Sequence, residues 1–216
     1  MAYPTVNAPY GLKPVNLIGG QVFAGQTREL PIASNYGTSI YNGDIVRISA
    51  GVIVKETGTT TVSATGVVGV FLGCSYTSPV TGQKLFANYY PASTVASDIL
   101  AYVADDPDQL FKVVLVSGAT EDGNGLVPAY LSRTVIGTNA ELVQNTGSTI
   151  TGDSKIGVYS AAGATTTATL PIRVIDVVPD TANSSGNFCE VIVKWNAPNV
   201  TGQTVAGGHQ YLNPTG

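Results

Sequence analysis

The sequence predicts an all-β fold, a jelly-roll-like β-sandwich or barrel with an extended N-terminal arm and an extended C-terminal tail. Many short runs rich in β-branched and aromatic residues follow one another, separated by glycine, asparagine and proline. Apolar and polar residues alternate in Ile172–Val177 and in Glu190–Trp195, as expected of strands with one buried face. The helix candidates are too short to form a helical layer, so the strands are expected to build the core.

Residues 1–20 are predicted to form the arm. Pro4, Pro9 and Pro14 recur every five residues, and glycines near the end of the segment disfavour a helix. The apolar side chains of the arm and of the tail are the contact points that we expect to bind a partner, together with the prolines that keep the arm extended. The expected partner-binding residues are Tyr3, Pro4, Pro9, Tyr10, Leu12, Pro14, Ile18, Tyr211 and Leu212.

Residues 21–197 are predicted to form the β core. Asp44–Ser49 and Gly51–Glu56 are expected to pair as a hairpin, because Gly51 can adopt a positive φ in the connecting turn. Two short helix candidates, Gly125–Arg133 and Thr138–Gln144, interrupt the series of strands, and the second begins with a capping-box pattern. Further strands are expected within 59–65, 67–73, 84–90, 98–103, 109–116, 155–160, 167–178 and 188–195.

Residues 198–216 are predicted to form the tail, since the segment is rich in glycine and proline and its substantial apolar residues are Tyr211 and Leu212. His209, the only histidine of the chain, lies within it. A segment flanked by Gly-Gly holds a catalytic base poorly. We therefore expect His209 to face solvent or an interface.

The composition argues against several classes of partner. Charged residues make up only 11% of the chain, and the net charge is −4, so nothing attracts it to nucleic acid or to an anionic membrane. No apolar run is long enough for a transmembrane helix, and the N-terminus lacks the pattern of a secretory signal. Cys74 and Cys189 fall in or beside apolar strand patterns, so both are expected to be buried, reduced thiols.

The sequence predicts no catalytic residue, no cofactor and no metal site. A structural zinc site needs about four Cys or His ligands, and the three in this chain lie far apart in the sequence. Asp105, Asp106 and Asp108 are the densest group of carboxylates, and two interpretations are open for them. Asp106–Gln109 has the pattern of a type I turn, whereas a weak cation site is the alternative.

The same stretch carries a resemblance to a protein family. "AYVADDPDQLFKV" (Ala101–Val113) resembles a signature of the capsid decoration, or cement, proteins of tailed phages. Other segments resemble that family in the expected order, whereas residues 198–216 lie beyond the pattern. These segments are Pro9–Val15, Tyr41–Gly51, Val67–Gly73, Ala140–Val158 and Ala168–Asp180.

The resemblance implies a non-enzymatic virion protein with a jelly-roll-like core. Such a protein would be made in the host cytoplasm and would stabilise an icosahedral head from outside, by bridging subunits of the major capsid protein. Its partners would be that protein and further copies of itself, as a dimer or trimer on the capsid surface, with no nucleic acid and no membrane bound.

Two other functions are weighed beside it. A phage fibre or adhesin module would bind cell-surface carbohydrate in a groove lined by aromatic residues such as Tyr89, Tyr90 and Trp195. A secreted hydrolase would need a carboxylate pair such as Asp98 and Asp106. The single tail histidine and the missing export signal argue against the hydrolase.

Overall fold

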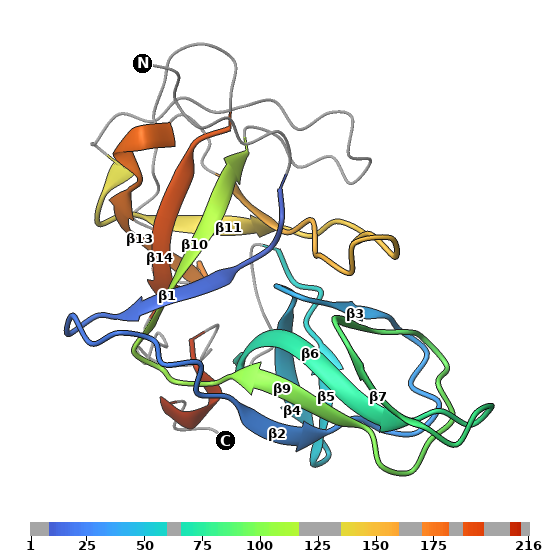
Figure 1. The fold of residues 1–216 in the computed structure, drawn as a ribbon. Helices are drawn as coiled ribbons and strands as arrows, with labels where there is room; N and C mark the ends of the chain where they lie inside the picture. Colours follow the sequence, from blue (N-terminus) through green and yellow to red (C-terminus); the bar gives the residue numbers. More distant parts are fainter. Residues whose placement is uncertain are drawn as a thin grey trace.

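A computed structural model of the chain describes residues 9–59, 66–116, 135–159, 170–181, 188–196 and 208–212. These residues form strands joined by turns, with two short 3-10 helices, η2 (Pro179–Thr181) and η3 (Gln210–Leu212) (Figure 1). The predicted all-β class is therefore confirmed. The strands are β1 (Lys13–Leu17), β2 (Arg28–Pro31), β3 (Ile40–Tyr41), β4 (Ile45–Ser49), β5 (Val52–Lys55), β6 (Gly69–Thr77), β7 (Lys84–Ala87), β8 (Tyr89–Tyr90), β9 (Leu100–Ala104), β10 (Gln109–Val116), β11 (Asn139–Val143), β12 (Gly157–Tyr159), β13 (Ile172–Val177) and β14 (Glu190–Trp195).

Five strands close into a barrel in the order β10–β12–β11–β13–β14, because β14 pairs back onto β10. The β10–β12 pair is parallel and the other pairs of the barrel are antiparallel. β1 pairs antiparallel with the first half of β10, whereas β12 pairs with its last two residues. The long strand β10 therefore pairs both with strands of the barrel and with β1 of the N-terminal segment.

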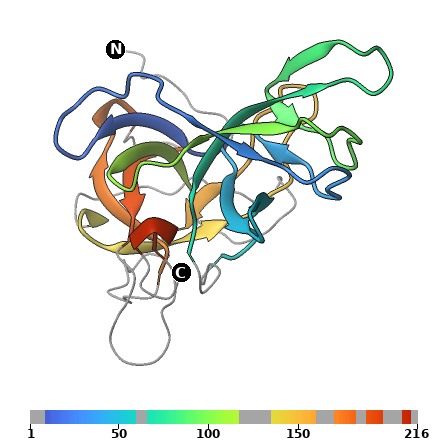
Figure 2. The same ribbon diagram turned by 90° about the horizontal axis from the view of Figure 1, so that it is seen from below.

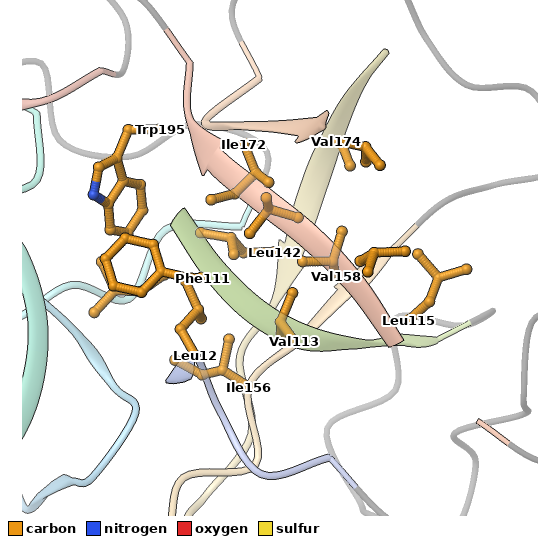
Figure 3. Packing of buried hydrophobic residues seen from close by; sticks show 14 of the residues in the cluster. Leu12, Phe111, Val113, Leu115, Leu142, Ile156, Val158, Ile172, Val174 and Trp195 are labelled. Atoms are coloured by element: carbon orange, nitrogen blue, oxygen red, sulfur yellow. The ribbon is translucent and has the colours of Figure 1, made fainter. Parts of the chain in front are cut away.

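The interior of the barrel follows from alternation along β10. Phe111, Val113 and Leu115 point inward and pack with apolar residues of the other barrel strands (Figure 3). Val114 and Val116, which alternate with Val113 and Leu115, belong to a smaller cluster on the other side of the strand. Because successive side chains of a strand point to opposite faces, this run of apolar residues serves two separate cores.

A second sheet has the order β2–β9–β6–β4–β5, and β7 pairs with β6 outside this path. A parallel bridge between Ile32 and Ile53 connects the β2 side to β5, so the sheet curves around a core of its own. β6 and β9 approach closely at Gly69, where an added Cβ would lie 2.1 Å from the carbonyl oxygen of Ala104. Figures 1 and 2 show the barrel and the second sheet side by side.

The predicted hairpin is confirmed as β4–β5, and Ala50 and Gly51 of its turn have positive φ angles of 49° and 81°. Of the predicted sandwich or barrel, the described strands form a closed barrel, which lies beside a second curved sheet; their pairing order does not show a jelly roll. Alternating patterns show which residues form strands and which faces are buried. They do not determine which distant strands pair.

The prediction of a separate arm ending at residue 20 is wrong for its described part. Residues 13–17 form β1, and Leu12, which is fully buried, lies in the barrel core. Pro14 is compatible with this position because β1 is an edge strand, where a proline costs no internal hydrogen bond. Tyr3 and Pro4 lie outside the described residues.

The described part of the tail is also packed against the core. His209 forms a parallel bridge with Val67, and the Gln210 side chain binds both the N–H and the carbonyl of Ile48 at 2.8 and 3.0 Å. The prediction of an extended tail is thus wrong for residues 208–212. The rest of the predicted tail lies outside the described residues.

The helix predicted over Thr138–Gln144 is a strand, β11, whose residues Ala140 and Leu142 point into the barrel core. Pairing with β12 and β13 satisfies its backbone, so tertiary contacts override the local capping pattern. The other candidate, Gly125–Arg133, lies outside the described residues.

The two cysteines are free and buried, as predicted. Cys74 lies in the core of the second sheet and Cys189 in the barrel core, and burial raises the pKa of the Cys74 thiol to about 12. Neither thiol is therefore expected to react rapidly in the folded protein. Among the described residues no helix has the length and apolar character needed to span a bilayer.

Candidate functional site

Four residues expected to bind a partner serve the fold instead. Leu12 is fully buried in the barrel core, and Pro9 is also buried. Pro14 lies within β1. The hydroxyl of Tyr10 donates to Glu190, and burial together with this hydrogen bond raises the pKa of Tyr10. Pro9 and Leu12 therefore cannot be exposed attachment points, and Tyr10 and Pro14 are at least partly enclosed by the chain's own strands.

The other described members of that set are exposed, and two of them, Ile18 and Tyr211, reach the same turn. Ile18 is 51% exposed, Tyr211 42% and Leu212 57%. The N–H of Ile18 donates to the carbonyl of Asp108 at 3.0 Å, and the Tyr211 hydroxyl donates to Asp105 at 2.8 Å. Segments from the two ends of the chain therefore meet at the turn between β9 and β10.

Val22, 77% exposed, adds a fourth apolar side chain at this place. A cavity of about 400 Å³ lies beneath the meeting point. We call Ile18, Val22, Tyr211 and Leu212 the corner surface, after the corner that the chain makes between β9 and β10. The residues that shape the cavity include Leu17, Val22, Phe23, Arg28, Asp105 and Tyr211.

Asp105 connects Arg28 with Tyr211 at the corner surface. Its carboxylate accepts from Nε of Arg28 at 2.9 Å and from the hydroxyl of Tyr211 at 2.8 Å. The Arg28 guanidinium also lies over the Tyr211 ring, 5.2 Å from its centroid. Burial and the hydrogen bond to Asp105 raise the pKa of Tyr211 to about 12, so the hydroxyl stays a donor at neutral pH.

The neighbouring carboxylates of Asp106 and Asp108 have other partners than Asp105 has. Asp106 Oδ1 accepts from the N–H of Asp108 at 2.8 Å, and its carbonyl accepts from the N–H of Gln109 at 3.1 Å. Asp108 pairs with Lys194 at 2.6 Å. The predicted turn is therefore confirmed. Within the described ranges, no cluster of three or more His, Cys, Asp or Glu side chains could hold a metal ion.

His209 is buried, contrary to the expectation that it would face solvent or an interface. It is 1% exposed, and its ring packs edge-on against Tyr211 with centroids 4.9 Å apart. Its Nδ1 accepts from the N–H of Tyr211 at 3.3 Å. The sequence pattern missed this position because Gly208, with a positive φ of 87°, allows the chain to turn sharply onto Val67.

Burial lowers the pKa of His209 below the ordinary 6.5. The unfolded chain therefore binds a proton at a higher pH than the folded chain, and the free energy of unfolding should fall as the pH drops below about 6.5. His209→Gln should remove this dependence, because the chain has no other histidine. Urea unfolding of both proteins, above and below this pH, checks it; equal pH dependence in the two proteins would contradict it.

The residues weighed for the two alternative functions do not form sites of those kinds. Tyr90 and Trp195 are buried core residues, and Tyr89 stacks on Tyr41. Asp98 and Asp106 stand beyond opposite ends of β9. The pKa of Asp98 is lowered because it accepts from Thr77 and Lys84, so it is suited to an ion pair and not to proton donation.

Sequence reasoning missed the roles of Arg28 and Val22. Arg28 is a single basic residue without a motif, and it meets Asp105 only because β2 pairs with β9. Val22 precedes Phe23 and Ala24 and forms a single β-bridge with Asn16, and its exposure depends on where the chain turns after β1. Neither feature has a local sequence signal, although the clustering of Asp105 with other acidic residues marked the corner itself.

Comparison of the chain with protein-family models, with curated proteins and with solved structures finds no match.

Proposed function

We propose that this chain is a non-enzymatic structural protein of a tailed-phage virion. It decorates the outside of the icosahedral head after synthesis in the host cytoplasm, and it cements the head by bridging subunits of the major capsid protein. The observation that supports this proposal best is the corner surface, where exposed apolar side chains from both ends of the chain meet. The resemblance of several segments to phage decoration proteins gives the proposal its direction.

The corner surface has the properties of a contact site. Isolated exposed apolar residues are common on soluble proteins, but apolar side chains gathered at one place are typical of an interaction surface, and here Val22 and Tyr211 line the same cavity. The Tyr211 hydroxyl is held by Asp105 and the backbone of Ile18 is held by Asp108, so the Tyr211 side chain has little freedom left to lose when a partner binds. Weak contacts of this size can hold the protein on the capsid shell. A chain that bridges several subunits is released only when all of its contacts are broken at the same time.

A second exposed region is suited to contacts between copies of the chain. The β6–β7 hairpin projects from the second sheet, away from the barrel (Figure 2). Val80 in its turn is 90% exposed, and Phe86 on β7 is 76% exposed. Among the described strands, β7 pairs only with β6, so its other edge is open to strand pairing. Self-association as a dimer or trimer is therefore part of the proposal.

A charge at the corner surface should weaken binding to heads. Val22→Asp places a carboxylate among the apolar contacts, where desolvation without a partner should lower affinity about tenfold or more. Ile150→Asp is the matched control, because Ile150 is 95% exposed and lies in the turn before β12, outside the corner surface. Co-sedimentation with heads prepared without this chain gives the two affinities.

The outcomes of that experiment separate the proposal from its competitors. Loss of binding by Val22→Asp with retention by Ile150→Asp is the expected result. Equal binding by both variants and the parent protein would move the attachment site elsewhere. Failure of the parent protein to bind heads at all would overturn the proposed function.

A further inference from the structure

The side of β7 that faces away from β6 presents backbone groups for hydrogen bonding. At the start of the β6–β7 pairing, the N–H of Ser78 donates to the carbonyl of Gln83 at 2.8 Å. Because the direction of the backbone groups alternates along a strand, those of Leu85 also face β6, whereas those of Lys84 and Phe86 face outward. Among the described strands, β7 pairs only with β6. We call this outward side the β7 edge.

The β7 edge is accessible to another molecule. Phe86 is 76% exposed and Leu85 37%, and as neighbours on a strand they lie on opposite faces of it. The β6–β7 hairpin projects away from the barrel, so a second chain can lie along the edge without meeting the barrel strands (Figure 2). An open edge with apolar side chains on both faces is a template for strand addition.

The charge that ordinarily protects such an edge is neutralised here. A lysine on an edge strand discourages pairing, because an added strand would have to cover its unpaired ammonium. Lys84 Nζ pairs with Asp98 at 2.9 Å, and the Asp98 carboxylate also accepts from the N–H and the hydroxyl of Thr77 at 2.9 and 2.8 Å. The hydrogen bonds from Thr77 and Lys84 hold the pKa of Asp98 well below its usual range. The pair therefore stays ionised and carries no net charge at neutral pH.

A second copy of β7 fits this edge best in one register. Antiparallel pairing of two identical strands has a two-fold axis, and outward-facing residues must pair with each other, so the axis passes through Lys84, Leu85 or Phe86. An axis at Lys84 places two ammonium groups directly opposite each other, which is unfavourable. An axis at Phe86 pairs Lys84 with Asn88, which lies beyond the end of β7 and binds the carbonyl of Thr151.

The axis at Leu85 avoids both problems. Lys84 of one copy then lies opposite Phe86 of the other, so each exposed ring covers the apolar stem of a lysine whose ammonium is already paired. Each copy gives and receives the same contacts, and the arrangement closes at two copies because each contributes one β7 edge. An edge of four residues buries less than the roughly 1,200 Å² typical of stable complexes, so the free dimer is expected to be weak.

We infer that the chain forms a two-fold dimer by antiparallel addition of β7 to β7 of a second copy, with Leu85 at the axis. The inference rests on the proposed function for its setting, and of the dimer and trimer left open there it selects the dimer. In Figure 1, β7 lies across the second sheet from the turn between β9 and β10. The two corner surfaces of a dimer are therefore free to bind two capsid subunits, and binding to the shell raises the local concentration that a weak dimer needs.

The test is disulfide cross-linking of the purified chain without heads, so its outcome does not depend on the proposed attachment. In Leu85→Cys each new thiol lies opposite its own copy, where Cβ atoms are about 4.5–5.5 Å apart and a small shift permits a disulfide. Val80→Cys is the matched control, because Val80 is 90% exposed in the same hairpin but two such residues would lie at opposite ends of the paired strands. In a glutathione redox buffer, Leu85→Cys should give about tenfold more linked dimer than Val80→Cys. The native cysteines are buried and do not compete.

Two further changes, each made in the Leu85→Cys chain, test the strand pairing itself. Phe86→Pro removes an outward N–H that pairing with β6 does not use, so the hairpin should remain while the linked dimer falls to the level of Val80→Cys. Phe86→Gln keeps the backbone and removes the exposed ring, and it should lower the linked dimer about threefold or more. Thermal unfolding shows whether each variant is folded, and Phe86→Gln decides the matter alone where the proline variant is not.

Sedimentation equilibrium of the parent chain should show monomer and dimer and no trimer. Equal cross-linking of Leu85→Cys and Val80→Cys would overturn the inference, as would a trimer, or cross-linking that both changes at Phe86 leave unaltered. Head binding by a parent chain that shows no β7 cross-linking would refute this dimer and leave the proposed attachment standing. Cross-linking by a chain that does not bind heads would do the reverse.

Discussion

Replacing Asp44 with alanine is expected to lower the free energy of unfolding by about 3–5 kcal/mol. Asp44 is fully buried where the second sheet meets the barrel. Its carboxylate pairs with Lys55 at 2.8 Å and accepts from the Ser154 hydroxyl at 2.6 Å and from the N–H of Tyr41. Removal of the carboxylate leaves the Lys55 ammonium, whose side chain is only 10% exposed, without a counter-charge.

A double-mutant cycle separates this cause from a simple loss of packing. Lys55→Met removes the charge and keeps most of the side-chain volume, so Asp44→Ala combined with Lys55→Met should cost less than the sum of the two single changes. Urea unfolding of the four proteins measures the coupling. A loss below about 0.5 kcal/mol for Asp44→Ala, the usual size of a surface change, would contradict the buried network.

Leu12→Ala should lower the free energy of unfolding by about 2–5 kcal/mol, as for other large-to-small changes in a core. Leu12 is fully buried and packs among the barrel residues in Figure 3. A residue of a free arm would show no such effect. Chemical denaturation of the purified chain, monitored by tryptophan fluorescence, measures the change through Trp195, which lies in the same core.

Ile18→Ala is the matched control for Leu12→Ala. Ile18 is 51% exposed and follows β1 by one residue, so its truncation should change stability by no more than about 0.5 kcal/mol. Comparable losses in the two variants would contradict the distinction between a buried and an exposed part of this segment. Deletion of residues 1–20 would remove β1 itself, and it therefore does not test head attachment cleanly.

Local chemistry explains which parts of the fold the sequence predicted. The β4–β5 hairpin follows from Gly51 between two alternating runs, and the Asp106 turn follows from an Asx residue before proline. Burial of Cys74 and Cys189 follows from their apolar neighbours. Each of these features depends on residues close together in the chain, so the pattern contains the information.

The features that the sequence did not predict depend on distant partners. Closure of the barrel requires β14 to return to β10, and no local signal specifies that pairing. Thr138–Glu141 carries a helix-capping pattern, but β12 and β13 are available to pair with residues 139–143. His209 is buried because the chain after Gly208 meets Val67, about 140 residues earlier in the sequence.

The candidate site was predicted in part. Ile18, Tyr211 and Leu212 are exposed, as residues that contact a partner must be, whereas Leu12 and Pro9 are buried. Apolar residues in a proline-rich segment suit either an attachment arm or an edge strand, and only the position of β10 decides between them. The meeting of Ile18 with Tyr211 at one corner was not foreseen, since it requires both ends of the chain to be placed.

Electron cryomicroscopy of phage heads prepared without this chain and then incubated with it tests the central claim most directly. The account predicts ordered additional density on the outer surface of the head, into which the barrel and the second sheet fit with Val22 and Tyr211 facing the major capsid protein. Heads that show no additional density after incubation, or density confined to the tail or its fibres, would contradict the account.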